Sequence, residues 1–467
     1  MSEILKQAAA YLNRVERPTQ FKSRFHFDVP IGWLNDPNGS VRAFGQYHVF
    51  YQHNPYWPQK RPMFWGHAVT DDLTHWRDLP PALAPDEDYD RDGCWSGTAM
   101  EWDGKLYLLY TGVRDGIQQQ CLAVTEDGVH FTKSPKNPVI PTGLLPPDSK
   151  PDDFRDPCLW REDGWFYAIV GGKDTRADCG RALLYRSRDL TEWAYVSDFY
   201  RDTSGTSHGI FECPAYLRAG NGEALVTSLN HVDDVGELYR NPHVPVAYLG
   251  RGDFAGGSFR SDQREMLDYG FDYYAPQIFR DGDRSLSVAW MQNWSRTYPT
   301  GDYGWIGSFT YPREITVQNG ALVQRPAREI DRFCRFVGRR TVSDPVSFPY
   351  QPARVKMTLG GNGAGFAVTS ADGTVRCVHS AARKALILTR DGNVGRRKRD
   401  DYEKNDAERV LPLSAPPSLD VLFDNASVEI FADTVCENAV MTSTFFFRNA
   451  TLTLTAPATC EFYQIEL

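Results

Sequence analysis

Three acidic side chains, Asp36, Asp156 and Glu212, hold equivalent places in a sequence that repeats itself five times. Each lies eight to ten residues before the turn glycine of its repeat, where the other two copies have Ser96 and Asp272. A single Asp-Pro is usually a turn former, but acids at equivalent repeat positions predict one shared site. Carboxylates gathered among aromatic residues suit glycoside hydrolysis, in which one attacks the anomeric carbon and another protonates the leaving oxygen.

The sequence around two of these acids suggests different protonation states. An apolar Cys-Pro pair follows Glu212. These apolar groups and the nearby acids would raise the pKa of Glu212. A carboxyl group that keeps its proton can donate it, so we expect Glu212 to be the proton donor. Asn35 and Asn38 flank Asp36 and can donate amide hydrogen bonds to an ionised carboxylate. We therefore expect Asp36 to be the nucleophile.

The repeat has a period of 58 to 60 residues, measured between its turn glycines. Each copy reads as a strand, a polar turn and an apolar strand, which is the pattern of a β-hairpin. Units of this length bury their faces by radial repetition, so five copies predict a five-bladed β-propeller whose innermost strands bring the acids together. The anchor glycines are Gly45, Gly104, Gly164, Gly222 and Gly282.

The chain as a whole is predicted to be all-β. Residues 1–19 read as an N-terminal helical segment, 20–330 as the five-bladed β-propeller and 331–340 as a linker. Residues 341–467 alternate apolar and polar residues between turns, which predicts a C-terminal antiparallel β-sandwich. The charged run at 396–404 is predicted to be a solvated loop.

Composition excludes several classes of partner. The 467 residues carry a formal net charge of −9 and no basic block, so nucleic acid is not an expected partner. No apolar run spans a membrane and the first residues lack a signal-peptide core, so we expect a cytoplasmic protein without a membrane partner. Nine cysteines without a CxxC pair predict reduced thiols, no metal site and no cofactor; a homo-oligomer stays open.

Eight motifs in order resemble glycoside hydrolase family 32, which comprises invertases, sucrose-6-phosphate hydrolases and exo-acting fructanases. The resemblance covers residues 25–330 strongly and the C-terminal part more loosely. It implies a five-bladed propeller followed by a sandwich, and a β-fructofuranosidase that retains anomeric configuration. The motifs are WLNDPNG (33–39), YHVFYQHNP (47–55), FWGHAVTDDLTHW (64–76), WSGTA (95–99), FRDP (154–157), ECP (212–214), FDYYAPQ (271–277) and GWIGSFTYPREI (304–315).

The resemblance also implies roles for individual residues. Asp36 would form a covalent fructosyl intermediate, Glu212 would be the acid/base, and Asp156 would hold fructose hydroxyls. For Trp65 and Trp290 the alternative is packing within the blades, whereas for Gln52 and Ser96, at strand ends, a structural hydrogen bond is equally plausible. The matching positions expected to bind the fructosyl unit are Asn35, Gln52, Trp65, Ser96, Arg155, Tyr274 and Trp290.

One loop departs from the family pattern. Several relatives carry a Trp between the YQ.NP and WGHA motifs, where this chain has WPQKRPMF with Trp57 displaced. We hypothesise that Lys60 or Arg61 offers a cation to a phosphorylated aglycone. The alternative is a solvent-facing Lys-Arg pair without function.

The expected reaction is hydrolysis of sucrose, sucrose 6-phosphate or short fructooligosaccharides, and three other functions are alternatives to it. A fructosyltransferase or an exo-fructanase would use the same residues, and sequence does not separate them. A non-catalytic carbohydrate-binding propeller would lack the catalytic acids, which this chain has. The GTSHG motif (205–209) fits the serine-hydrolase pattern but leads directly into a strand, where that chemistry needs a helix.

Overall fold

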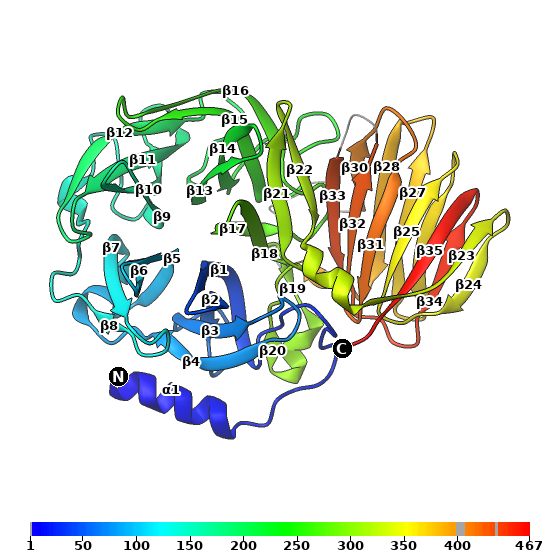
Figure 1. The fold of residues 1–467 in the computed structure, drawn as a ribbon, viewed down its shortest axis with the longest axis horizontal. Coiled ribbons are helices and arrows are strands. Elements are labelled where there is room, and N and C mark those ends of the chain that lie inside the picture. The colour runs from blue at the N-terminus through cyan, green and yellow to red at the C-terminus, as the bar shows by residue number, and fades with distance from the viewer. Residues whose placement is uncertain (1, 398–406, 435–437) are drawn as a thin grey trace.

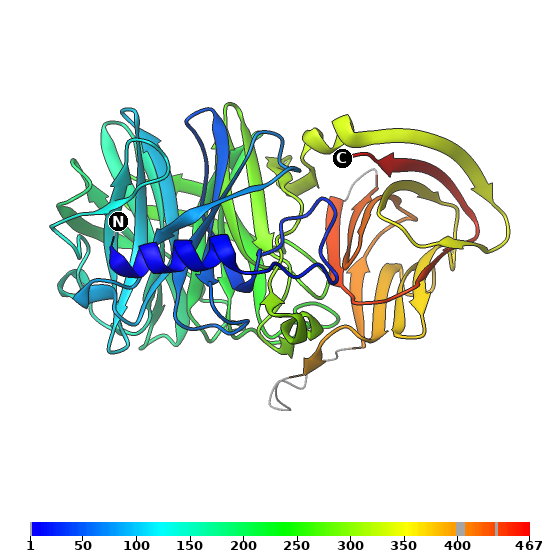
Figure 2. The same cartoon turned by 90° about the horizontal axis from the view of Figure 1, so that it is seen from below.

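Five antiparallel sheets surround a common axis, and two further sheets face each other beside them (Figures 1 and 2). The computed structural model describes residues 2–397, 407–434 and 438–467. The all-β prediction of a five-bladed propeller followed by a sandwich is confirmed. Within the described ranges, no helix is long and apolar enough to cross a membrane.

The blades follow one another in chain order, each running from an inner to an outer strand. The first contains β1 (Gly32–Ala43), β2 (Gln46–Asn54), β3 (Phe64–Thr70) and β4 (Arg77–Leu83). The second contains β5 (Gly93–Trp102), β6 (Lys105–Arg114), β7 (Ile117–Thr125) and β8 (Thr132–Lys133). The third contains β9 (Phe154–Glu162), β10 (Trp165–Asp174), β11 (Cys179–Ser187) and β12 (Trp193–Arg201). The fourth contains β13 (Phe211–Ala219), β14 (Gly222–Leu229), β15 (Val244–Asp253) and β16 (Ser258–Met266). The fifth contains β17 (Tyr274–Asp281), β18 (Arg284–Trp290), β21 (Arg313–Gln318) and β22 (Ala321–Pro326).

Glycine ends the inner hairpin turn of each blade, as the repeat predicts. Gly45, Gly104, Gly164 and Gly282 have φ between 63° and 82°, the left-handed region in which a side chain is strained. In the fourth blade the left-handed residue is Gly220, at φ 68°, whereas the predicted anchor Gly222 is the first residue of β14. Counted from Gly220, Glu212 lies eight residues before its turn.

The turn after the third strand is built by the same device in three blades. Asp72 accepts hydrogen bonds from the backbone N–H groups two and three residues further on. Asp127 and Asp189 do the same in the second and third blades. These local bonds stabilise a turn and lead into the outer strand.

The ring closes between the first and the last blade. The inner strands contact one another in order, and β1 contacts β17. Strand β20 (Trp305–Ile306), which follows β18 in the chain, pairs in parallel with the start of β1. A segment of the fifth blade region thereby joins the sheet of the first blade and ties the ring together.

The sandwich consists of two six-stranded sheets around an apolar core of its own. One sheet has the order β23 (Cys334–Val342), β35 (Ala458–Ile465), β25 (Ala353–Leu359), β31 (Ser418–Asp424), β32 (Ser427–Asp433) and β33 (Asn438–Thr444). The other has the order β24 (Val346–Pro349), β34 (Thr451–Thr455), β26 (Gly365–Ser370), β27 (Gly373–Ser380), β28 (Ala385–Gly392) and β30 (Glu408–Pro412).

Two predicted segments differ from expectation. The expected linker 331–340 contains most of β23, which pairs with β35 at the edge of the sandwich. Its side chains are mostly exposed on both faces, so it lacks the apolar alternation by which a strand is predicted. Residues 396–397 of the expected loop form β29 and pair with β19 (Arg296–Thr297) of the propeller, whereas 398–404 lie outside the described residues. The remaining division, 1–19, 20–330 and 341–467, stays a proposal.

Short helices complete the fold. Helix α1 (Glu3–Arg14) is capped by Ser2, whose Oγ accepts from the N–H of Leu5. Leu5 and Ala8 are its buried residues, and the helix packs against β4 of the first blade. The 3-10 helices are η1 (Asp88–Asp90), η2 (Thr142–Leu144), η3 (Pro299–Tyr303) and η4 (Arg328–Phe333).

Candidate active site

A register shift interrupts each of the five inner strands close to the start of the strand. Two residues of the inner strand oppose one of the neighbouring strand at Asn35–Asp36, at Asp156–Pro157 and at Cys213–Pro214, and the other two inner strands shift register at the same level. A bulge bends the strand and redirects its side chains. Asp156, Cys213 and Ala275, each before a proline, have φ of 62°, 47° and 50°. Such strained backbone is typical of functional sites.

Asp36 is partly exposed and only one of its oxygens has a partner. Ser96 Oγ donates to Oδ2 at 2.6 Å, whereas Oδ1 is buried and accepts no hydrogen bond within the described chain. Burial raises the pKa of Asp36, and the Ser96 bond opposes that rise. Asn38 was expected to donate to Asp36, but its side-chain oxygen accepts a hydrogen bond from Gln52 Nε2 at 2.9 Å instead. The carboxylate is therefore incompletely satisfied, as a group that waits for a ligand would be.

Glu212 has partners at both oxygens. Arg155 Nη2 donates to Oε1 at 2.7 Å, and the Tyr274 hydroxyl donates to Oε2. Burial would raise the pKa of Glu212, but the charge of Arg155 and both hydrogen bonds outweigh burial and lower it. The prediction of a raised pKa at Glu212 is therefore wrong for the free protein, because the cation and the hydroxyl come from neighbouring inner strands that the local sequence does not reveal.

Asp156 lies between the other two acids. The backbone N–H of Cys213 donates to its Oδ2 at 3.0 Å, and Cys213 Sγ lies 3.7 Å from that oxygen and 3.8 Å from Asp36 Oδ2. Burial raises the pKa of Asp156 to about 7, although Arg155 opposes the rise. Arg155 Nε is 3.9 Å from this carboxylate, so the positive charge of Arg155 limits the rise without cancelling it.

The structure brings most of the predicted binding residues to the same end of the axis. Asn35, Ser96, Arg155 and Tyr274 contact the acids or their immediate partners. Gln52 is buried and donates to the carbonyl of Cys94. Their roles toward a sugar stay predictions.

The two predicted sugar-binding tryptophans are fully buried. Trp65 donates through Nε1 to the carbonyl of Trp95 and packs against Phe50 in the first blade. This arrangement favours blade packing. Trp290 packs against Trp33 and Trp294, and its Nε1 has no hydrogen-bond partner among the described residues.

Two threonines that bond to the backbone of the site residues were not predicted from the sequence. Thr111 Oγ1 accepts from the N–H of Asp156 and donates to the carbonyl of Ser96. Thr227 donates to the carbonyl of Glu212. Both lie on a second strand, in the runs YLLYTGV and EALVTSL. A hydroxyl in an otherwise apolar buried strand is the signal that could have identified them, because a buried polar group needs a partner.

Asp272, placed with the acids by the repeat, lies elsewhere. It precedes β17, is buried and binds Arg390 and the N–H of Thr444, both in the sandwich. Tyr274, eight residues before Gly282, holds the axial position in the fifth blade.

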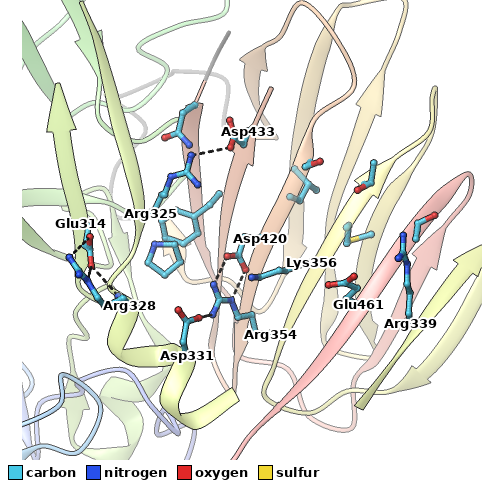
Figure 3. Close-up of a pocket in the computed structure, with 18 residues that line it drawn as sticks. Glu314, Arg325, Arg328, Asp331, Arg339, Arg354, Lys356, Asp420, Asp433 and Glu461 are labelled. Atoms are coloured by element: carbon cyan, nitrogen blue, oxygen red, sulfur yellow. Dashed lines mark hydrogen bonds and ion pairs between the residues drawn. The ribbon is translucent and has the colours of Figure 1, made fainter. Parts of the chain in front are cut away.

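A separate groove of about 480 Å³ runs between the last blade and the sandwich (Figure 3). Arg354 reaches across it to Asp331 and Asp420, and Arg325 pairs with Asp433. These ion pairs connect η4 and β22 to the sandwich. The groove does not include the axial acids.

The axial site has the equipment of a glycosidase: three carboxylates, of which one carries a free oxygen and one is held by an arginine and a tyrosine. Comparison with known proteins identifies the family. The sequence matches the family model "Glycosyl hydrolases family 32 N-terminal domain" over residues 26–326. It is 33% identical over 450 residues to a sucrose-6-phosphate hydrolase of Escherichia coli, covering 92% of this chain and 90% of that protein.

Two further relatives agree. A raffinose invertase of Escherichia coli is 37% identical over 341 residues, which are 71% of this chain and 70% of that protein. Among solved structures, an aspartate-to-alanine mutant of a Bombyx mori β-fructofuranosidase in complex with sucrose has a TM-score of 0.86 at 25% identity, covering 99% of this chain and 97% of that one. The chain belongs to glycosyl hydrolase family 32 and is a glycoside hydrolase of the β-fructofuranosidase type.

Proposed function

We propose that the protein is a retaining β-fructofuranosidase that removes the terminal β-D-fructosyl unit of sucrose, sucrose 6-phosphate or short fructooligosaccharides. The observation that carries the proposal is the cluster of three acids at the propeller axis: Arg155 contacts Glu212 and Asp156, and Cys213 Sγ contacts Asp156 and Asp36. The relatives named as sucrose-6-phosphate hydrolase and invertase support these substrates.

In the first step the free oxygen of Asp36 attacks C2 of the fructosyl unit. The bond between C2 and the glycosidic oxygen breaks as Glu212 transfers its proton to that oxygen, and the aglycone leaves as an alcohol. In the second step Glu212, now ionised, takes a proton from water, and the water oxygen displaces Asp36 from C2. Two displacements at C2 give net retention.

Glu212 must carry a proton when the substrate arrives. In the free protein, Arg155 and Tyr274 stabilise its ionised form. A neutral sugar that enters between Arg155 and Glu212 separates this pair and removes water, and both changes raise the pKa of Glu212. Substrate binding itself is therefore proposed to prepare the acid.

Asp156 is proposed to accept hydrogen bonds from fructose hydroxyls rather than to react. Its Oδ2 is fixed by the Cys213 N–H, so its position is set before the sugar binds. Asn35, Gln52, Ser96, Arg155 and Tyr274 are proposed to complete the fructosyl site, with Trp290 behind them.

The test is a substrate panel with product analysis. Sucrose, sucrose 6-phosphate, 1-kestose and inulin are compared by kcat/KM, and the anomer released first is identified by NMR. Turnover of sucrose or sucrose 6-phosphate with initial release of β-fructose supports the proposal, and initial release of α-fructose contradicts the retaining mechanism. Fructosylated products at high sucrose would identify a transferase, and a preference for inulin an exo-fructanase.

We further propose a cytoplasmic location. Eight cysteines lie in the described chain and none of them forms a disulfide, which suits a reducing compartment. A homo-oligomer also stays a proposal, and light scattering would test it.

A further inference from the structure

The loop at residues 55–62 carries two cations to the solvent side of the axial acids. It connects β2 to β3 in the first blade. Trp57, Lys60 and Arg61 in this loop are exposed. Below them lie the half-buried rings of Trp95 and Trp294.

One buried side chain holds this loop in place. Asn54 Nδ2 donates to the carbonyl of Gln59 at 2.9 Å and to that of Arg61 at 2.6 Å. Its Oδ1 accepts from the N–H groups of Tyr56 and Trp57. The backbone that carries the two cations is thus fixed by four hydrogen bonds from within the blade. A fixed backbone presents its side chains in one place, as a binding loop requires.

Helix α1 supports the loop from the outside. The ring of Tyr11 lies 5.1 Å from that of Tyr56, and Tyr56 packs beside the small apolar cluster of Leu5 and Ala8. The N-terminal helix therefore contributes to the position of a loop at the active site.

The cations lie over aromatic rings and lack acidic partners. Lys60 Nζ is 4.4 Å from the ring centre of Trp294 and 5.4 Å from that of Trp95, and the Arg61 guanidinium is 5.7 Å from the latter. Within the described chain neither forms an ion pair with a carboxylate. Each retains its hydrogen-bond donors for a ligand.

The order of groups indicates which part of the substrate meets these cations. The fructosyl carbon must reach Asp36, whose Oδ2 is bonded to Ser96. Trp95 precedes Ser96 in the chain, and Lys60 Nζ lies 5.4 Å from the centre of the Trp95 ring. The charges of Glu212 and Asp36 also act on Lys60. A leaving group that extends from C2 past Trp95 therefore comes within reach of Lys60 and Arg61.

We propose that Lys60 and Arg61 bind a phosphate on the leaving group, so that the protein acts on sucrose 6-phosphate in preference to sucrose. This inference rests on the proposed function. A phosphate carries between one and two negative charges near neutral pH, and Asp36, Asp156 and Glu212 would repel it. Two unpaired cations between the acids and the phosphate remove that repulsion and add charge-assisted hydrogen bonds.

A different role predicts a different result. Lys60 also feels the negative charge of Glu212 and Asp36. If it served only as their counter-charge, its loss would reduce turnover of both substrates by the same factor. Phosphate recognition instead changes the ratio of the two kcat/KM values.

The experiment measures that ratio in the wild type and in Lys60→Gln, Arg61→Gln and the double variant. We expect a wild-type ratio above 1 in favour of sucrose 6-phosphate and a fall of about 10- to 100-fold in the ratio for the double variant. Lys60→Arg should retain most of the preference because it keeps the charge. Lys136→Gln, which removes an exposed cation in the second blade, is the matched control and should leave the ratio unchanged.

Two results would overturn the inference and leave the proposed function intact: a wild-type ratio of 1 or below, or an equal fall for both substrates in the variants. Failure of the wild type to cleave either substrate would instead contradict the proposed function. As a second measurement, Tyr11→Ala should reduce the ratio by a smaller factor than the double variant, since it loosens only the support of the loop.

Discussion

Among the buried charges of the described residues, the cluster at the propeller axis and the cluster between the propeller and the sandwich differ in how completely their acids are paired. In the interface cluster, Asp424 accepts hydrogen bonds from four backbone N–H groups and from His26 Nδ1. Glu429 accepts from His26, the N–H of Tyr311 and Arg313. Each acid there has several partners, and the pKa of both Asp424 and Glu429 is lowered despite burial.

The axial cluster is satisfied far less completely. Asp36 has a buried oxygen without a partner, and burial raises the pKa of both Asp36 and Asp156. The same cost of removing a carboxylate from water is offset by hydrogen bonds and charges at Asp424 and Glu429 and left partly uncompensated at Asp36 and Asp156. The comparison indicates that the interface charges serve stability and the axial charges reactivity.

The largest expected effect is that of Asp36→Asn, which should abolish activity without lowering thermal stability. Asp36→Asn should reduce kcat/KM by about 10⁴-fold or more, because the nucleophile is lost. The raised pKa of Asp36 means that its ionised form destabilises the fold above the unfolded pKa, so a neutral amide should leave the thermal midpoint unchanged or higher. Activity assays and calorimetry on the same sample check both statements.

Asp344→Asn, an exposed aspartate in the sandwich, is the control and should change neither quantity. A clear fall of the midpoint in Asp36→Asn would contradict the view that the axial acid costs stability. Activity above a few per cent of wild type would remove Asp36 from the role of nucleophile.

The second prediction reverses the pattern at the interface. Arg313 binds Asp268 at 3.0 Å and Glu429 at 2.6 Å and is fully buried. Arg313→Met leaves Asp268 without a cation and Glu429 with His26 alone, and should lower the free energy of unfolding by about 3–5 kcal/mol. Urea denaturation followed by tryptophan fluorescence measures the loss, and kcat of the folded enzyme at low temperature should stay near wild type.

Arg325→Met is the matched control, since Arg325 forms an exposed ion pair with Asp433 across the same interface. Exposed pairs contribute about 0–1 kcal/mol. Equal losses in the two variants would show that burial does not distinguish them, and the comparison of the clusters would fail.

The fold was predictable because the repeat appears in the sequence as regularly spaced turn glycines. Glycine is required where φ is positive, as at Gly45 and Gly104, so its spacing reports the blades directly. The strand β23 was not predictable, since an exposed edge strand rich in arginine has no apolar alternation. The strand β23 forms by pairing with β35 (Ala458–Ile465), which is more than 100 residues further along the chain. The local sequence of β23 does not reveal this partner.

The site was predictable in part for the same reason. Asp156 and Ser96 lie eight residues before their turn glycines, and Glu212 does so once Gly220 is taken as the anchor. The pKa of Glu212 was not predictable, because Arg155 and Tyr274 come from different blades. A two-residue error in register likewise placed Asp272, rather than Tyr274, at the axis, although Asp272 binds the sandwich.

The third prediction uses pH to separate the clusters. Burial alone would lower the pKa of His26, but Asp424 and Glu429 outweigh burial and raise it to about 9. Its folded pKa exceeds the unfolded value of about 6.5, so its contribution is complete below about pH 6.5 and is lost as the pH rises through about 9. The contribution of His26 to the free energy of unfolding should fall by about 3 kcal/mol over this range, whereas Lys22, whose pKa burial lowers to about 8, contributes with the opposite sign.

Urea midpoints measured between about pH 7.5 and 10 check this, because Asp156, with a pKa of about 7, has completed most of its titration there. His26→Gln should be less stable at neutral pH and should lose less of its stability as the pH rises. An identical pH dependence in wild type and variant would show that His26 is not the titrating group.

The smallest effect tests the electrostatics of the proposed acid. The hydroxyl of Tyr274 donates to Glu212 Oε2 and helps to lower the pKa of that carboxyl. Tyr274→Phe removes the donor, so the pKa of Glu212 should rise. The acid then keeps its proton to higher pH, and the alkaline limb of the kcat/KM profile should move up by the same amount.

The matched control is Tyr298→Phe, which removes a hydroxyl that donates to Asp272 at 3.3 Å in the interface region. That variant should lower the thermal midpoint and leave the pH profile of kcat/KM in place, because Asp272 binds Arg390 and Thr444 rather than substrate. An alkaline limb that stays fixed in Tyr274→Phe, or moves to lower pH, would show that Glu212 does not set it. The same loss of one tyrosine hydroxyl thus has different consequences at the axis and at the interface, since only the axial carboxylate must change its protonation state during the reaction.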